Sequence, residues 1–315
     1  MFLKCAAVGS GAAVATGLWV ATSRRRAARY LHEMISDARR VVASPPVKPA
    51  PGTWNDNRIT ICWVGHATVL INFYGIRILT DPALFKRIGI WLGVGTGGPK
   101  RYIAPALQLK ELPPIDVLLL SHAHMDHMDV PSLRGLASNV FTVTAKLTTD
   151  ILPSNLKRVT ELGWNEDATF RNGKGDLQIE AVEVKHWGRR WPSDLDRGYN
   201  GYVLRREGKT LLFGGDTART EKFREIRSRG PFEAAILPIG AYRPWIWNHC
   251  TPEEAVELAD SAGAGFIVPI HHHTFRLSEE PMNEPIERLE EALAHEPERL
   301  ALRRVGESFT LPAAR

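Results

Sequence analysis

The chain of 315 residues is 44% hydrophobic and 24% charged, a balance that excludes a disordered or fibrous protein and allows a large core. Its net charge of +5 resides in residues 1–40, where seven basic residues outnumber two acidic ones, while the rest of the chain holds 33 of each sign. A body without net positive charge lacks the basic surface of a nucleic-acid enzyme, so we expect no nucleic-acid partner.

Residues 5–23 carry no charge and are rich in alanine and glycine. As a helix they would reach roughly 28 Å, close to the ~30 Å core of a bilayer. Because Lys4 precedes them and three arginines follow at 24–26, the positive-inside rule predicts a membrane anchor at 1–23 with the body in the cytoplasm. The alternatives are a signal peptide cleaved near Ala13-Val-Ala15 and a soluble tail. The three cysteines are scattered, which favours a reducing compartment.

The next segment, residues 24–52, is expected to connect the anchor to a single domain at 53–315. Residues 24–42 are basic and predict a helix on anionic headgroups, so the membrane surface is an expected partner through residues 1–42. The proline-rich stretch 45–52 is typical of a stiff linker.

Strand and helix patterns alternate through the predicted domain. A hairpin at 57–81 is expected to turn at Tyr74-Gly75, and a second, with strands 202–204 and 210–213, at Glu207-Gly208. Further strands are expected at 115–120, 140–144, 177–185 and 265–270, and helices at 131–136, 252–262 and 284–295. Strand-rich halves with outer helices fit an α+β fold of two sheets packed face to face.

The stretch Ser-His-Ala-His-Met-Asp-His, residues 121–127, follows the apolar strand 115–120 and is the most informative part of the chain. Imidazole nitrogens and carboxylate oxygens are the ligands of Zn²⁺ and similar ions. In an extended segment His122 and His124 point the same way, whereas a turn directs Asp126 and His127 elsewhere. One loop can therefore serve two metals.

Four ligands cannot complete two coordination shells, so more are expected downstream. Three further candidates each follow an apolar strand, namely His186, Asp216 and His271. Each alone has the alternative of a hydrogen-bonded loop residue, but together with the loop at 122–127 they indicate a metal site. Ligation by His and Asp is expected because the cysteines lie apart.

These residues resemble those of the metallo-β-lactamase superfamily, and within it the branch of N-acyl-phosphatidylethanolamine-hydrolysing phospholipase D and its bacterial relatives. The resemblance extends over about residues 50–310. Beyond the ligand motif it rests on the blocks 63–68, 79–82, 98–102, 111–116, 214–217, 238–242, 249–256 and 271–275. It implies an αβ/βα sandwich of two packed mixed β-sheets flanked by helices.

The resemblance also implies how the ligands divide. One metal would take His122, His124 and His186, the other would take Asp126, His127 and His271, and Asp216 would bridge them. The expected cofactors are two divalent ions, Zn²⁺ first, with iron or manganese as alternatives. Two such cations lower the pKa of a shared water, and the resulting hydroxide would attack a phosphodiester, with Asp126 and Asp216 acting in catalysis through the metals.

Other side chains are weaker candidates. Asp81 could orient a ligand imidazole, with a turn residue before Pro82 as the alternative. His66 and His249 correspond to histidines that line the site in the related phospholipases, so each could bind phosphate or protonate the leaving group, or be a structural histidine. Relatives have His-Trp-Gly where this chain has His271-His272-His273, which leaves open which histidine binds.

Three functions remain at this point. The first is a phospholipase D-type phosphodiesterase acting on N-acyl-phosphatidylethanolamine or a related phospholipid; the second is a soluble-substrate hydrolase such as a lactonase or cyclic phosphodiesterase; the third is a structural metal protein. A homo-oligomer is compatible with the sequence. The aromatic residues expected to meet an acyl chain, unless they only pack the core, are Trp91-Leu92, Trp187, Trp191 and 242–247.

Overall fold

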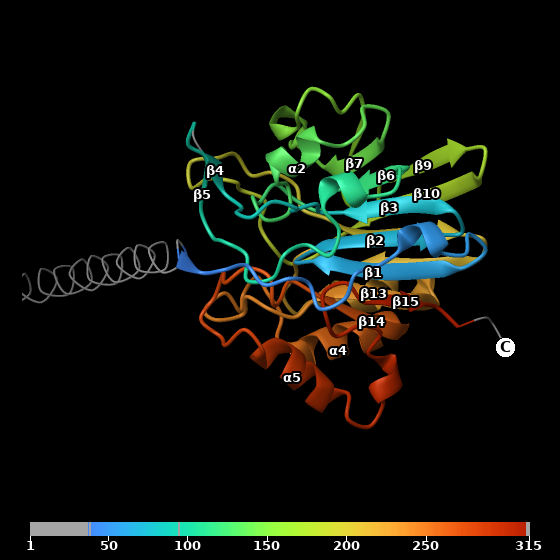
Figure 1. Ribbon diagram of the computed structural model, residues 1–315. Helices are drawn as coiled ribbons and strands as arrows, with labels where there is room; N and C mark the ends of the chain where they lie inside the picture. Colours follow the sequence, from blue (N-terminus) through green and yellow to red (C-terminus); the bar gives the residue numbers. More distant parts are fainter. Residues whose placement is uncertain (1–36, 38, 94, 313–315) are drawn as a thin grey trace, which may run out of the picture. The chain divides into compact units, whose positions relative to one another are not determined.

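Two large β-sheets stand face to face in the computed structural model (Figure 1), which describes residues 37, 39–93 and 95–312. Within these residues one sheet has seven strands in the order β15-β1-β2-β3-β6-β7-β8, and the other has six, β14-β13-β12-β11-β10-β9. The strands of the first are β1 (Ile59–Gly65), β2 (Thr68–Phe73), β3 (Ile76–Thr80), β6 (Val117–Leu119), β7 (Phe141–Ala145), β8 (Arg158–Leu162) and β15 (Ser308–Thr310). Those of the second are β9 (Asp167–Asn172), β10 (Gly175–Val182), β11 (Gly201–Arg206), β12 (Lys209–Phe213), β13 (Phe232–Pro238) and β14 (Ala264–Ile270). A small hairpin pairs β4 (Ile90–Trp91) with β5 (Thr96–Gly97).

The period-two alternation of the strands builds the core. In β12, Leu211 and Phe213 join the apolar cluster between the sheets, whereas Leu212 joins the cluster on the outer face. In the first sheet, Ile71 faces inward and Leu70 faces outward. The central strands of each sheet, such as β2 and β12, are thus buried on both faces.

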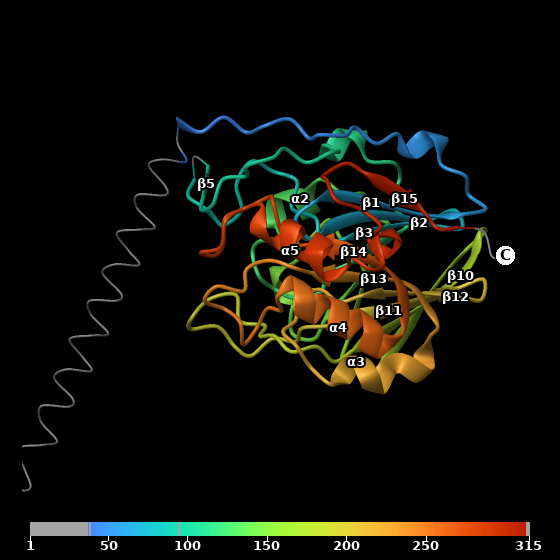
Figure 2. The same ribbon diagram turned by 90° about the horizontal axis from the view of Figure 1, so that it is seen from below.

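Helices cover the outer faces (Figure 2), and they are α2 (Val130–Arg134), α3 (Lys222–Glu225), α4 (Pro252–Ala262) and α5 (Glu284–Ala292). Helix α4 packs against β13 and β14, and α3 and α5 contact α4. Helix α4 begins at a capping box of Thr251 and Glu254 with Pro252 in the first turn, and it ends at Gly263, whose backbone is left-handed. The α+β sandwich is therefore confirmed.

Both predicted hairpins form as expected. Tyr74 and Gly75 have φ of 49° and 87°, and Glu207 and Gly208 have 50° and 69°. Positive φ at both central residues matches the right-handed twist of paired strands.

The topology brings several strand ends to one edge. Strands β12, β13 and β14 are parallel neighbours, and β10 runs in the same direction because it is antiparallel to β11, which is antiparallel to β12. Strands β1, β3 and β6 share one direction for the same reason. Carboxyl ends of strands that share a direction meet at one edge, where α/β sheets place their sites.

The prediction of a membrane-anchored protein is corrected. No helix among the described residues combines the length and the apolar character needed to cross a membrane. The predicted anchor at 1–23 lies outside the described residues, as does most of the basic segment 24–42.

The segment predicted as a linker belongs to the compact unit that begins at Val42. The amide of Ala43 donates to the carbonyl of Tyr102, and the amide of Val47 donates to the carbonyl of Val305. Residues 51–53 form a 3-10 helix.

Candidate metal centre

The loop after β6 holds four of the predicted ligands, and a tight turn gives it its shape. The amides of His127 and Met128 both donate to the carbonyl of His124, at 3.1 and 2.7 Å. This turn separates His122 and His124 from Asp126 and His127, as the sequence pattern predicts.

The first cluster consists of His122, His124 and His186, which follow β6 and β10. The Nδ1 atom of His124 lies 2.8 Å from Nε2 of His122 and 3.2 Å from Nε2 of His186. Ligand atoms of a tetrahedral zinc ion are about 3.3 Å apart, given Zn–N bonds of about 2.0–2.1 Å. All three ligand atoms lie within 4.8 Å of one another, close enough for one cation to bind them together.

Neighbouring bonds fix the tautomers of this cluster. Nδ1 of His186 donates to the carbonyl of Asn248 at 2.9 Å, so its Nε2 presents a lone pair. The Ser121 hydroxyl donates to Asp81, so it accepts from Nδ1 of His122 at 2.9 Å, and Nε2 of His122 also presents a lone pair. Nδ1 of His124 can carry at most one proton, so it can donate a hydrogen bond to only one of the two Nε2 lone pairs that face it. A cation would satisfy all three nitrogens.

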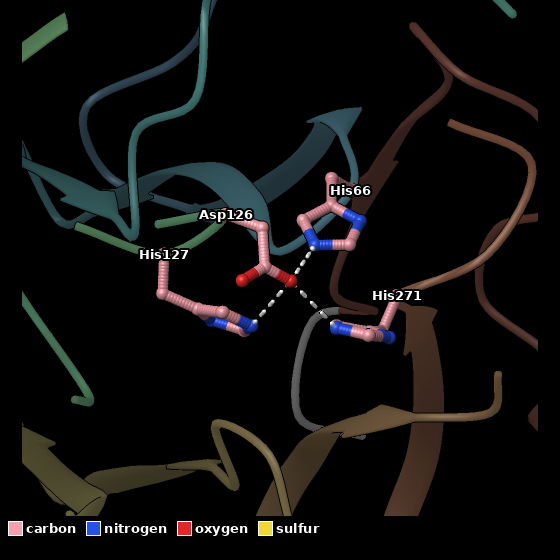
Figure 3. Close-up of side chains that lie close together, drawn as sticks. All are labelled: His66, Asp126, His127 and His271. Carbon is pink, nitrogen blue, oxygen red and sulfur yellow. Dashed lines mark hydrogen bonds and ion pairs between the residues drawn. The ribbon is translucent and has the colours of Figure 1, made fainter. Parts of the chain in front are cut away.

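The second cluster surrounds Asp126 (Figure 3). Its Oδ2 lies 2.9 Å from Nε2 of His66, 3.4 Å from Nε2 of His127 and 3.3 Å from Nε2 of His271. His127 and His271 are predicted ligands, and His66 joins them after β1, where the register with β2 shifts between Trp63 and Gly65.

Asp216, after β12, lies between the two clusters. Its Oδ2 is 3.0 Å from Nε2 of His127 and 3.2 Å from Nε2 of His271. The same oxygen is 3.8 Å from Nε2 of His186 and 4.0 Å from Nε2 of His122. Its Oδ1 is buried and has no hydrogen-bond partner within the part of the chain that the structure describes. A buried carboxylate in reach of both clusters fits the bridging position.

The site contains both neutral imidazoles and imidazoles whose charged form the nearby carboxylates stabilise. Burial lowers the pKa of His122 and of His186 well below the usual value, so both imidazoles are neutral. Burial also opposes the charged form of His271, but the Asp216 carboxylate and the bond to Asp126 outweigh it and raise that pKa to about 9. Protons and divalent cations are alternative partners for the two carboxylates, so metal binding is expected to release protons.

Asp81 sits behind the clusters. Its Oδ2 accepts from Nδ1 of His127 at 2.8 Å and from the Ser121 hydroxyl, while Oδ1 accepts from the Ser121 amide at 2.8 Å. The bond holds His127 in the tautomer whose Nε2 faces Asp126 and Asp216. Three residues at the site have a left-handed backbone: Asp81, His66 and His271, with φ of 33°, 56° and 64°.

His249 approaches from the loop before α4. Its Nδ1 is buried, lies 3.9 Å from Oδ2 of Asp216 and has no hydrogen-bond partner among the described residues. Burial lowers its pKa to about 4, so the imidazole is neutral.

His272 and His273 point away from both clusters. The ring of His272 stacks on Trp63 with 4.3 Å between centroids, and Nε2 of His273 lies 2.9 Å from Oδ1 of Asn283. Among the described residues neither histidine belongs to a group able to hold a metal. The geometry therefore favours His271 as the ligand from this run.

Most of the aromatic candidates are exposed side chains, whereas Tyr242 is buried with 3% of its surface exposed. The exposed fractions of Trp91, Trp191, Trp245 and Trp247 are 62%, 41%, 42% and 75%. Trp187 is half-buried, with its ring 4.2 Å from that of His186 and 4.6 Å from that of His124. It covers the first cluster.

Contacts of the site that the sequence did not predict include two that hold the first cluster. The carbonyl of Asn248 orients His186, and Arg190 binds the loop that carries the first four ligands. A contact through a backbone carbonyl cannot be read from residue type. The contact of Arg190 could have been predicted only if the path of its loop toward the ligand loop had been known.

Comparisons with known proteins identify the family of the chain. Residues 77–272 match the family model described as the beta-lactamase superfamily domain. A protein of Mycobacterium tuberculosis is 34% identical over 82% of this chain and 72% of its own length. N-acyl-phosphatidylethanolamine-hydrolyzing phospholipase D 1 of Caenorhabditis elegans is 33% identical over 73% of this chain and 68% of its own length. The mitochondrial enzyme of that name in Saccharomyces cerevisiae is 31% identical over 72% of this chain and 50% of its own length.

Solved structures share the fold at low identity. Isothiocyanate hydrolase from Delia radicum gut bacteria matches with a TM-score of 0.62 and 18% identity, over 79% of this chain and 98% of that one. A metallo hydrolase from Ignicoccus hospitalis gives 0.59 and 18%, over 81% and 99%. The chain is a metal-dependent hydrolase that belongs to the metallo-β-lactamase superfamily, among relatives that include N-acyl-phosphatidylethanolamine-hydrolysing phospholipases D.

Proposed function

We propose that the protein is a binuclear phosphodiesterase of phospholipase D type, acting on N-acyl-phosphatidylethanolamine or a related phospholipid. The observation that carries the proposal is the position of Asp216, whose Oδ2 lies within 4.0 Å of imidazole nitrogens from both clusters. Paired metals are suited to phosphoryl transfer because they act on the attacking and the leaving oxygen. The worm and yeast relatives supply the choice of phospholipid.

The proposed ligands divide as the distances group them. His122, His124 and His186 would hold one divalent ion, Asp126, His127 and His271 would hold the other, and Asp216 would serve both. The donor set of imidazole and carboxylate suits Zn²⁺, and iron or manganese would also be accepted. When bound, the pair supplies positive charge for the phosphoryl oxygens and lowers the pKa of water.

His66 and His249 receive different roles from their surroundings. His66 is buried and bonded to Asp126, so it would orient that carboxylate. Nδ1 of His249 lies beside Asp216 and has no hydrogen-bond partner in residues 37, 39–93 and 95–312, so it would contact the phosphate or the leaving group.

The loop between β13 and α4 supports a lipid substrate. Trp245, Ile246 and Trp247 are 42%, 39% and 75% exposed, on the loop that also carries His249. Exposed apolar side chains in a row are unfavourable in water unless they meet an apolar partner, and an acyl chain is such a partner.

Product analysis tests the proposal. Metal-loaded protein is incubated with vesicles of N-acyl-phosphatidylethanolamine, and products are identified by mass spectrometry, with Asp216→Ala as the blank. Phosphatidic acid and N-acylethanolamine are the products of phospholipase D-type cleavage. Diacylglycerol with a phosphorylated headgroup would contradict that bond choice. Faster turnover of a lactone or a cyclic phosphodiester than of any phospholipid would establish the soluble-substrate alternative.

A further inference from the structure

Two adjacent arginines follow Trp187-Gly188, and their side chains have different surroundings. Arg189 is exposed and pairs with the exposed Asp196 at 2.5 Å. Arg190 is half-buried, and its Nη1 donates to the carbonyl of Ala123 at 2.6 Å and to that of Met128 at 3.1 Å.

Those two carbonyls belong to the ligand loop. Ala123 lies between His122 and His124, and Met128 directly follows His127. One guanidinium nitrogen therefore contacts the ligand loop at two points, directly after His122 and directly after His127. Arg190 itself is four residues after His186, which completes the first cluster.

The loop that carries Arg190 has a firm base. Arg197 is buried, and its guanidinium contacts Asp194 at 2.7 Å and Asp150 at 2.5 Å. Asp194 in turn accepts from the Arg190 amide at 3.0 Å. A Cβ at Gly188 would lie 1.9 Å from the carbonyl oxygen of Arg197, so the two arms of the loop approach as closely as backbone allows.

The two bonds from Arg190 to the carbonyls of Ala123 and Met128 are suited to a guanidinium group. Burial lowers the pKa of Arg190, and the nearby carboxylates of Asp129 and Asp126 oppose that effect. Guanidinium nonetheless stays charged at neutral pH and offers donors in a fixed plane, whereas lysine has a shorter reach and a point charge. Bonds from a charged donor to carbonyls are stronger than neutral ones.

We propose that Arg190 is a positioning residue that sets the distance between His186 and the pair His122 and His124, and thereby controls how long the first cluster retains its metal. The inference rests on the metal centre of the proposed function, but not on the phospholipid substrate.

Metal retention measures this role without turnover. The full chain is loaded with cobalt(II), and loss of its d–d absorption is followed after addition of a chelator. In Arg190→Met, one of the two metals is expected to leave about 10–100-fold faster, the usual effect of removing a group that orients a ligand. Arg190→Lys should be intermediate, and Arg189→Met, which removes the exposed neighbour, should match the unchanged protein.

The remaining readouts separate positioning from other roles. With a phosphodiester substrate, kcat should fall in Arg190→Met while KM stays within about twofold. A raised KM with normal cobalt retention would make Arg190 a substrate contact and overturn the proposal. Equal cobalt loss in the two methionine variants would overturn it as well.

General destabilisation is controlled by Arg205→Met, which removes a pair with Glu180 at 2.8 Å on the second sheet. If that variant loses cobalt as fast as Arg190→Met at a similar fall in Tm, the proposal is overturned. Absence of phospholipid hydrolysis would contradict the proposed substrate and leave the cobalt measurement interpretable.

Discussion

The two halves of the candidate metal centre are built in different ways. The first sheet supplies His122, His124, Asp126 and His127 from one short loop, which is held by Asp81, Ser121 and Arg190. The second sheet supplies His186, Asp216 and His271 from the ends of three separate strands. One half therefore depends on local bonds, and the other depends on how strands lie beside one another.

The difference has a consequence for substitutions. In the loop, each ligand has neighbours that hold the segment in place when one side chain is lost. In the second sheet, each proposed ligand is the only one of its strand end. The pairing of β10 with β11 positions His186, and the parallel register of β12, β13 and β14 positions Asp216 and His271. Losing such a side chain removes the whole contribution of that strand end, so the largest effects are expected there.

Replacing Asp216 with alanine should have the largest effect, because its Oδ2 faces both clusters. Activity should fall by more than about 100-fold, beyond the range for a group that only orients a ligand. Elemental analysis should find metal lost from both clusters. Two equivalents of metal in Asp216→Ala would contradict the shared position.

His271→Ala should come next, since its Nε2 faces both Asp126 and Asp216. We expect loss of the metal of the second cluster and a fall in activity of about 100-fold. His273→Ala and His272→Ala are the matched controls and should keep metal content near normal. If His272→Ala loses the metal and His271→Ala keeps it, the assignment within this run is wrong.

Asp81→Asn tests the half that local bonds support, with a smaller expected effect. The amide keeps one acceptor oxygen in place of two, and it no longer provides a charged acceptor for both His127 and Ser121. Metal affinity measured by competition with a chelator should fall about 10–100-fold. An unchanged affinity would mean that the other bonds of the loop suffice to orient His127.

The substitutions Trp245→Ser and Trp247→Ser should have the smallest effect on activity, and that effect should be confined to lipid substrates. Burying one methylene of the acyl chain is worth about 0.8 kcal/mol, so KM for a long-chain phospholipid should rise about fourfold for every methylene that the variant leaves in water. KM for a short soluble phosphodiester should not change. Equal effects on both substrates would place these exposed side chains outside the acyl path.

The sequence predicted the part of the centre that local pattern encodes. The His and Asp spacing of 121–127 and the apolar strands before His186, Asp216 and His271 identified the groups that the structure brings together. It did not predict that His66 would bond to Asp126, because a register shift in β1 directs that side chain.

The fold was predictable where periodicity or turn chemistry was strong, as at both hairpins and at α4. Strand β13 was missed because it is buried almost throughout and shows no alternation, which is usual for a parallel strand covered on both faces. The edge strands β9 and β15 were missed because their pattern is weak. The anchoring prediction was wrong, since charge order and length were applied to a segment that is only weakly apolar.

The left-handed backbone at His66, Asp81 and His271 sets a limit on engineering this domain. Such conformations cost of order 1–3 kcal/mol each in residues other than glycine, so the surrounding fold must over-determine them. Variants selected only for heat resistance would gain by relaxing these three positions, and each relaxation would remove an imidazole or a carboxylate from the site. Thermostabilisation should therefore proceed on the outer helices and distant hairpins, with these positions held fixed.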